Sequence, residues 1–210
     1  GLSEEGYLII DQEHLIFDEG NPNDPYSLEA SDDGSWVSSP STSMYGSRGV
    51  VGVMGYFYGG TPEYETSSIM NGGTFILKLT EDGGHSWTDT PRYITEDVFN
   101  NVVEEHFLEY ADEYGNYFGG DLSTGWEYDM KMDSDETIHI VMQLSSRSSD
   151  GSVYYCDNNG HDNGSGWYHF KASFDDLLSD NPEDWNWEYS KVVTGAYTWC
   201  YENYQGSYIR

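Results

Sequence analysis

One octet, Thr80-Glu81-Asp82-Gly83-Gly84-His85-Ser86-Trp87, constrains the fold of this chain more than any other feature. It fits the pattern Ser/Thr-x-Asp-x-Gly-x-Ser/Thr-Trp at all of its defined positions. The aspartate can accept backbone N–H groups inside a tight turn, and the glycines adopt positive φ without strain. We therefore expect a β-hairpin in which Thr80 ends one strand, Ser86 starts the next and Trp87 packs beneath the turn. An ordinary Asp-Gly hairpin followed by a strand tryptophan would give the same local pattern.

The octet resembles the Asp-box, the hairpin turn that is repeated around the rim of sialidase-type β-propellers. The resemblance rests on this one full Asp-box and on degenerate repeats elsewhere among the 210 residues. It implies that the Asp-box residues are structural rather than catalytic, namely Thr80, Asp82, Gly84 and Trp87.

A weak repeat surrounds the octet. Six-residue segments of similar character begin at residues 24, 73, 151 and 195, at spacings of 49, 78 and 44 residues. Asp-box-like stretches, one shortened and one lengthened, follow the first and third of these segments at 31–36 and 157–167. Spacings of 44 and 49 suit one four-stranded blade each, and 78 suits a blade with a long insertion or two poorly matching blades.

The rest of the sequence favours β structure. Tyrosine is the leading aromatic residue with 19 copies, and glycine has 24. β-Branched and aromatic residues predict strands at 6–10, 49–58 and 137–143. Residues 129–138 read as strand, Asp-rich turn and strand, and resemble an Asp-Ser-Asp-Gly-x-x-His-Val hairpin of Asp-box propellers, with Glu136 where glycine is usual. Short helices are expected near 95–99 and 173–178.

We therefore predict an all-β fold, a β-propeller-like array of four-stranded antiparallel blades that forms a single domain over residues 1–210. At roughly 45 residues per blade the chain supplies about four or five blades. That is fewer than a sialidase-type ring contains. We expect a partial propeller, or one part of a larger ring that further sequence or other copies complete.

The charge of the chain is strongly acidic. Its 38 Asp and Glu residues outnumber 8 Lys and Arg residues, which gives a formal net charge of −30. Such a surface repels nucleic acid and anionic membranes, so both are poor partners. The sequence contains no apolar run long enough for a membrane span. A halophilic or marine setting explains the acidic surface, and together with the β composition it predicts an extracellular or cell-surface location.

Divalent-cation binding is the functional alternative for these carboxylates. The side chains of Asp157, Asn159 and Asp162 offer hard oxygen ligands within one loop, which suits Ca²⁺. The pair Asp133 and Asp135 and the stretch 18–24 offer similar groups. None of them matches the EF-hand spacing, and turn formation explains each equally well. The two cysteines, Cys156 and Cys200, occupy equivalent repeat positions, which favours two thiols over a disulfide.

The sialidase resemblance implies a retaining glycosidase in which three arginines clamp the substrate carboxylate. The candidates here are Arg48, Arg92 and Arg147. However, the Arg-Ile-Pro signature of the family is missing, because Gly49 and Val50 follow Arg48. We expect that this chain alone is not an enzyme. A sialidase-like glycoside hydrolase or a propeller-type polysaccharide lyase is the alternative.

The predicted function is therefore a binding or structural role in an extracellular assembly, with carbohydrate or other extracellular protein chains as partners. Exposed tryptophans can stack on sugar faces, and the candidates are Trp126, Trp185 and Trp187. Packing inside a blade would explain the same residues. A third possibility is an architectural subunit whose acidic surface binds Ca²⁺ between copies.

Overall fold

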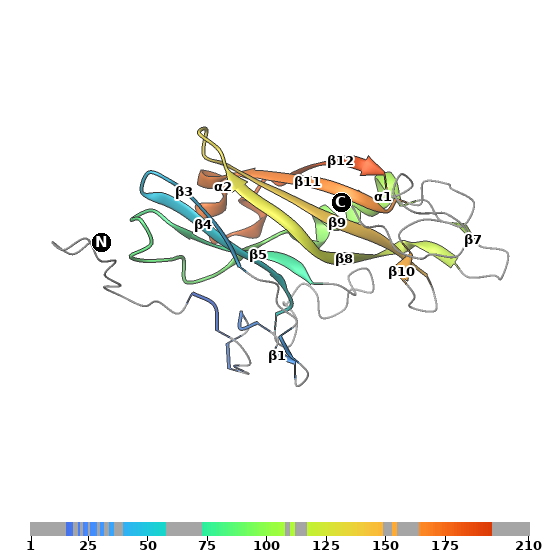
Figure 1. Ribbon diagram of the computed structural model, residues 1–210, viewed down its shortest axis with the longest axis horizontal. Coiled ribbons are helices and arrows are strands. Elements are labelled where there is room, and N and C mark those ends of the chain that lie inside the picture. Colours follow the sequence, from blue (N-terminus) through green and yellow to red (C-terminus); the bar gives the residue numbers. More distant parts are fainter. Residues whose placement is uncertain are drawn as a thin grey trace, which may run out of the picture.

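The computed structural model describes residues 16–18, 21, 23–24, 26–28, 30–31, 34–35, 40–57, 73–107, 110–111, 117–148, 153–154 and 164–194. This part of the chain is mostly β, with two antiparallel sheets, a small ribbon and two short α-helices (Figure 1). The predicted all-β class is thus confirmed. Among these residues the sheets close into neither a barrel nor a propeller ring.

The first sheet has four strands that follow one another in order. They are β3 (Ser41–Tyr45), β4 (Arg48–Gly55), β5 (Thr74–Thr80) and β6 (Arg92–Tyr93). The central strands β4 and β5 are buried along almost their whole length, as their runs of Val, Ile, Leu and Phe require. Gly46, with φ of 64°, makes the tight turn from β3 to β4.

The second sheet is longer and has the order β12-β11-β9-β8-β7, with β10 paired to β9. Its strands are β7 (Tyr110–Ala111), β8 (Tyr117–Met132), β9 (Thr137–Ser148), β10 (Val153–Tyr154), β11 (Gly166–Ser173) and β12 (Glu188–Thr194). Buried and half-buried residues alternate along β11, so one face of this sheet is packed and the other is open to solvent. We call the open side the outer face.

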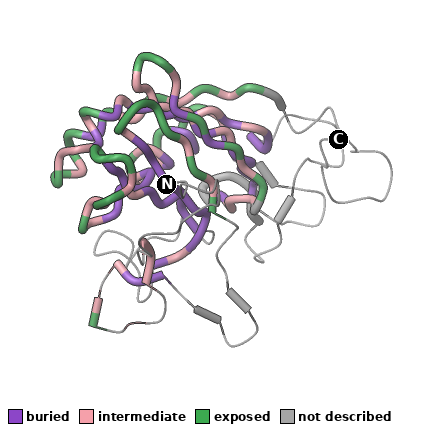
Figure 2. The backbone as a smooth tube through the Cα atoms, turned by 60° about the vertical axis from the view of Figure 1, so that its left-hand side comes forward, coloured by how far each residue is buried: buried purple, intermediate pink, exposed green. Residues whose placement is uncertain are grey.

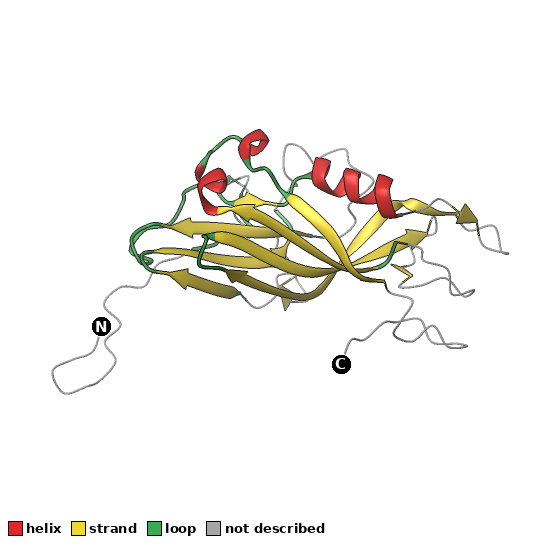
Figure 3. Ribbon diagram, turned by 90° about the horizontal axis from the view of Figure 1, so that it is seen from above, coloured by secondary structure: helices red, strands yellow, loops and turns green. Residues whose placement is uncertain are grey.

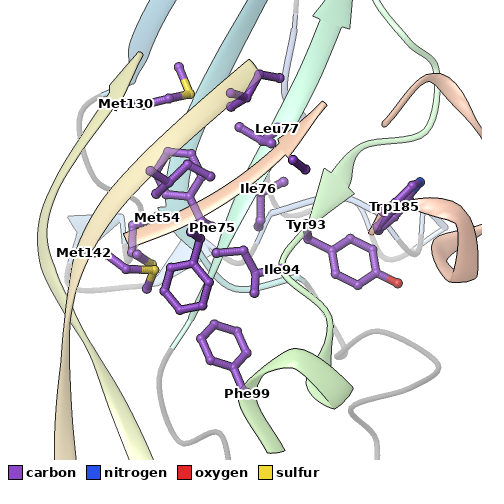
Figure 4. Close-up of a cluster of buried hydrophobic side chains, with 14 of the residues drawn as sticks. Met54, Phe75, Ile76, Leu77, Tyr93, Ile94, Phe99, Met130, Met142 and Trp185 are labelled. Carbon is purple, nitrogen blue, oxygen red and sulfur yellow. The ribbon is translucent and has the colours of Figure 1, made fainter. Parts of the chain in front are cut away.

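The inner face of the second sheet packs against the first sheet to form one core (Figures 2 and 4). The ring of Tyr128 in β8 meets that of Phe75 in β5 edge-on, with 4.6 Å between centroids. Its hydroxyl donates to the carbonyl of Gly52 at 3.3 Å. Where β3 approaches β8, the Ser43 hydroxyl accepts the backbone N–H of Met132 at 3.0 Å. The two sheets are therefore held by polar bonds as well as by apolar burial.

Helical segments lie along one side of the sheets (Figure 3). The first, α1 (Glu96–His106), buries Phe99, Val102 and Val103, which share one face of the helix. The second, α2 (Phe174–Leu178), begins at Ser173, whose hydroxyl accepts the backbone N–H of Asp176 at 3.0 Å. Both predicted helices are confirmed, and α1 continues beyond residue 99. A 3₁₀ turn, η1 (Pro182–Asp184), follows α2.

Some predictions fall outside these elements. The shortened Asp-box-like stretch coincides with the ribbon of β1 (Ala30–Ser31) and β2 (Gly34–Ser35), although residues 32, 33 and 36 are not described. The predicted strand at 6–10 and both cysteines also lie outside the described residues. In the part of the chain that is described, no helix is long and apolar enough to cross a membrane.

Candidate functional site

The Asp-box octet forms a tight turn directly after β5, organised by the carboxylate of Asp82. Its Oδ1 atom accepts the backbone N–H of Ser86 at 2.8 Å, and its Oδ2 atom accepts the Ser86 hydroxyl at 2.7 Å. The Thr80 hydroxyl donates to Oδ1 at 2.8 Å and accepts the N–H of Gly84 at 2.9 Å. These hydrogen bonds, led by those from Ser86, hold the pKa of Asp82 well below its ordinary value. Gly83 and Gly84 have φ of 75° and 90°, as the pattern requires.

Two details of the predicted hairpin are wrong. Ser86 does not start the next strand, because β6 begins only at Arg92. Trp87 is half-buried rather than a buried plug, and its indole lies against Gly84 at the edge of the turn. The intervening residues reach β6 through a loop, so the tryptophan stays beside the turn and does not enter the core.

A second turn capped by side chains lies between α2 and β12, on the connection from β11 to β12. The backbone N–H of Asn181 donates to the Ser179 hydroxyl at 3.2 Å, and that of Glu183 donates to the Asn181 side-chain oxygen at 3.4 Å. The first bond corresponds to the one from Asp82 to Thr80 in the octet. Trp185 ends the turn, buried with 1% exposed, and its Nε1–H donates to the Ser179 carbonyl at 2.8 Å. The spacing Ser-x-Asn-x-x-x-Trp, which is one residue shorter than in the octet, is the sequence signal that could have revealed this turn.

Arg48 and Arg92, two of the three candidate catalytic arginines, are engaged by the protein itself. The Arg48 guanidinium lies 2.5 Å from Glu136, 2.9 Å from Asp175 and 3.1 Å from Glu81. It therefore links the Asp-box turn of the first sheet to the β8–β9 turn and to α2.

Arg92 is buried, with 1% of its side chain exposed. It donates to the carbonyls of Leu177 and Leu178 at 2.6 and 3.2 Å and pairs with Asp180 at 2.8 Å. The contacts of both guanidinium groups are thus made with groups of the protein itself. The side chain of Arg147, in β9, is not among those described.

The two candidate ligand-binding tryptophans that are described pack with the core, which is the alternative that the sequence left open. Trp185 belongs to the core, where its ring meets Tyr93 edge-on at 5.1 Å. Trp187 is half-buried and donates its Nε1–H to the Tyr93 carbonyl at 3.0 Å. Asn186 between them has φ of 38°, and both tryptophans precede β12. The side chain of Trp126 is not described.

Calcium ligands find no support in the described residues. Asp157, Asn159 and Asp162 lie outside them. Asp133 acts as a turn former, because its Oδ1 atom accepts the backbone N–H groups of Asp135 and Thr137 at 2.9 and 3.0 Å. In the segments that are described, no three His, Cys, Asp or Glu side chains surround a common point.

Comparisons with known proteins found no matching family model, curated protein or solved structure. The resemblance to the Asp-box therefore rests on the octet and on the hydrogen bonds within its turn.

Proposed function

We propose that this chain is an extracellular Asp-box module that binds carbohydrate, or a partner chain carrying it, within a larger assembly. The observation that carries the proposal is where the Asp-box occurs. It lies between the third and fourth strands of a sheet whose strands follow one another in order. The turn at Ser179 lies on the connection between the last two long strands of the second sheet, after α2.

This arrangement supports the finer prediction of a propeller-like array. Successive blades of a propeller are sheets of sequential antiparallel strands, each with equivalent connections. We extend the proposal to say that the two sheets are neighbouring blades of a partial or composite ring. An experimental structure of the assembled protein tests this directly. A solution assembly in which no further sheet packs beside these two would contradict it.

Binding is favoured over hydrolysis by the state of the arginines. A sialidase-like clamp needs guanidinium groups that are free to meet the substrate carboxylate. Arg48 already contacts three carboxylates, and Arg92 is buried against backbone carbonyls. Releasing either arginine would break its own contacts with the second sheet and α2. A sialidase-like activity would therefore have to be built from other groups.

The surface best suited to carbohydrate is the outer face of the second sheet, which the proposal places at the uncovered end of a partial array. Trp167 lies on it in β11, half-buried, on the same side as His169 and Lys171. A flat aromatic ring beside hydrogen-bonding side chains matches the alternating apolar faces and hydroxyl edges of a sugar. Trp167 therefore replaces Trp185 as the candidate sugar-stacking residue, because Trp185 is buried in the core.

A glycan-binding screen of the purified chain, followed by affinity measurement on any ligand found, tests the proposal. We expect binding that Trp167→Ala weakens at least tenfold. The matched control is Tyr45→Ala, which removes an aromatic side chain that is 49% exposed at the β3–β4 turn. This control should leave the affinity unchanged.

The same samples should be assayed for hydrolysis of aryl glycosides, sialosides included. The proposal predicts no turnover. Multiple turnovers that survive Trp167→Ala would instead support the glycoside hydrolase alternative. If the folded chain bound no glycan, the proposed carbohydrate ligand would be rejected. The architectural role would then be the remaining proposal.

A further inference from the structure

Two histidines meet on the outer face of the second sheet, on the neighbouring strands β9 and β11. The Nδ1 atom of His139 lies 2.9 Å from the Nε2 atom of His169. The ring planes differ by only 8° and the ring centroids are 5.1 Å apart, so the rings meet edge to edge in nearly one plane. This is the geometry of an N–H···N hydrogen bond, in which one ring donates and the other accepts.

Asp133 decides which of the two rings donates. Its Oδ2 atom lies 3.0 Å from His139 Nε2, while its Oδ1 atom accepts the backbone N–H groups of Asp135 and Thr137. The hydrogen bond with His139, followed by those from the backbone, holds the pKa of Asp133 below its ordinary value, so this carboxylate is ionised wherever histidines titrate. A carboxylate can only accept hydrogen bonds, so His139 Nε2 carries a hydrogen. The Nδ1 atom of the neutral His139 ring is then bare and accepts the Nε2–H of His169.

The ring hydrogens of the pair show where a further proton can enter. Two neutral rings carry one hydrogen each, and here one lies on His139 Nε2 and the other lies between the rings. The Nδ1 atom of His169 is left without a hydrogen, and no hydrogen bond to it is found among the described residues. The pair can therefore take up one proton, at this atom. A second proton would place N–H against N–H across the 2.9 Å contact and would separate the rings.

We infer that Asp133, His139 and His169 form a proton switch that decides whether His169 Nδ1 accepts or donates a hydrogen bond on the outer face. Above the titration of the pair this atom is an acceptor, and below it the atom is an N–H donor on a positively charged ring. Trp167 lies two residues from His169 on the same face, so the switch changes the chemistry of the surface proposed to bind carbohydrate. The switch itself does not depend on that proposed function, and only its effect on ligand binding rests on it.

The surroundings of the pair set the range in which the switch operates. Partial burial, followed by the positive charges of His139 and Lys171, lowers the pKa of His169 below its ordinary value, so the pair is neutral in neutral solution. The charged groups that face the pair from the strands around it are Lys131, Lys171, Asp129, Asp133 and Glu188. Two positive and three negative charges leave one negative charge, which a single proton on the pair balances. The charges around the pair thus also favour the uptake of one proton over two.

The test is nuclear magnetic resonance of the full chain with ¹⁵N-labelled histidine rings, because ring nitrogens with and without a hydrogen give well-separated signals. In neutral solution we expect the hydrogen on Nε2 in both His139 and His169. As the pH falls, His169 Nδ1 should gain a hydrogen, and the signals of both rings should shift in one common step. A parent protein in which His169 carries its hydrogen on Nδ1, or in which the two rings titrate in independent steps, would overturn the inference.

Asp133→Asn should reverse the tautomers of both rings. The side-chain oxygen of the asparagine can keep the two backbone N–H groups, so its NH₂ group faces His139 Nε2 and needs an acceptor there. Both rings should then carry their hydrogen on Nδ1, and His169 should lose its outward acceptor. Circular dichroism checks that the variant is folded, and unchanged tautomers in the folded variant would overturn the role of Asp133. The internal control is His85, which is exposed on the Asp-box turn and should give the same signals in the parent and the variant.

The effect of the switch on ligand binding is measured with a glycan identified in the binding screen. The affinity of the parent should change at least threefold across the titration of the pair, and that of His169→Gln should stay constant over the same pH range. A constant affinity in the parent would reject the effect on binding. If no glycan binds, the proposed function fails, whereas the tautomers of the parent still decide for or against the switch.

Discussion

Arg48 and Arg92 hold opposite ends of the same five-residue helix, α2. Arg48 pairs with Asp175 in its first turn at 2.9 Å, and Arg92 donates to the carbonyls of Leu177 and Leu178 at its end. So short a helix has no stability of its own, and its last carbonyls lack partners within the helix. The two arginines of the first sheet therefore provide partners for the groups at both ends of α2. In doing so they also connect the first sheet to α2, which follows β11 of the second sheet.

The two arginines should differ in their response to substitution and salt. Arg92→Met leaves buried carbonyls without donors, which costs about 3 kcal/mol in the free energy of unfolding. Arg48→Met removes partly exposed ion pairs, so we expect a smaller loss that shrinks as NaCl is added. Urea denaturation at low and high salt measures both. A loss for Arg92→Met that vanishes at high salt would show that its pairing with Asp180, rather than the carbonyl contacts, dominates.

Position 136 departs from the hairpin pattern, which favours glycine there, and the contact of Glu136 with Arg48 offers a reason for the departure. Its φ is 58°, a conformation that is strained for any residue other than glycine, and its carboxylate reaches Arg48. In an Arg48→Met background, where that partner is gone, Glu136→Gly should stabilise the protein by about 1 kcal/mol. In the parent the gain should be smaller, because the ion pair is lost. Equal effects in the two backgrounds, measured as a double-mutant cycle, would contradict this coupling.

The pH dependence of stability should reveal the Asp82 turn. Since hydrogen bonding lowers the folded-state pKa of Asp82, its contribution is complete above the unfolded value of about 3.9 and is lost as pH falls below it. Asp82→Asn should therefore be less stable than the parent at pH 7, and the difference should narrow from about pH 4 downward. Thermal melts of both proteins across this range provide the measurement. Asp89→Asn, an exposed carboxylate on the same loop, is the control.

Trp185 should contribute more to the free energy of unfolding than Trp87, although Trp87 is the tryptophan of the octet. Trp185 is buried beside Tyr93 and hydrogen-bonded to Ser179, so Trp185→Ala should cost about 3–5 kcal/mol in unfolding free energy. Trp87 is half-buried beside Gly84, and Trp87→Ala should cost clearly less. Chemical denaturation of both variants decides the order. A larger loss of unfolding free energy for Trp87→Ala would instead indicate that Trp87 packs fully beneath the turn.

Local chemistry explains which parts of the fold could be read from the sequence. The Asp82 turn, the Asp133 hairpin and the Ser173 cap are each set by residues within a few positions of one another. The turn, the hairpin and a short helix at 173–178 were predicted. The partners of Arg48 lie up to 127 residues away from it, and those of Arg92 up to 88. His139 and His169 meet only because of the β9–β11 register. Such pairings depend on how strands are arranged, and spacing along the chain does not encode them.

The net charge of −30 predicts a dependence of stability on salt. Self-repulsion weakens the folded state at low ionic strength, and ions screen it over a Debye length of about 10 Å at 0.1 M. Melting temperature should therefore rise with NaCl. A further rise in CaCl₂ at matched ionic strength is expected if the loop containing Asp157 binds calcium, because a ligand that binds only the folded state stabilises it by mass action. Coincident curves in the two salts would eliminate a calcium site, and Asp157→Asn should abolish the extra rise if the site exists.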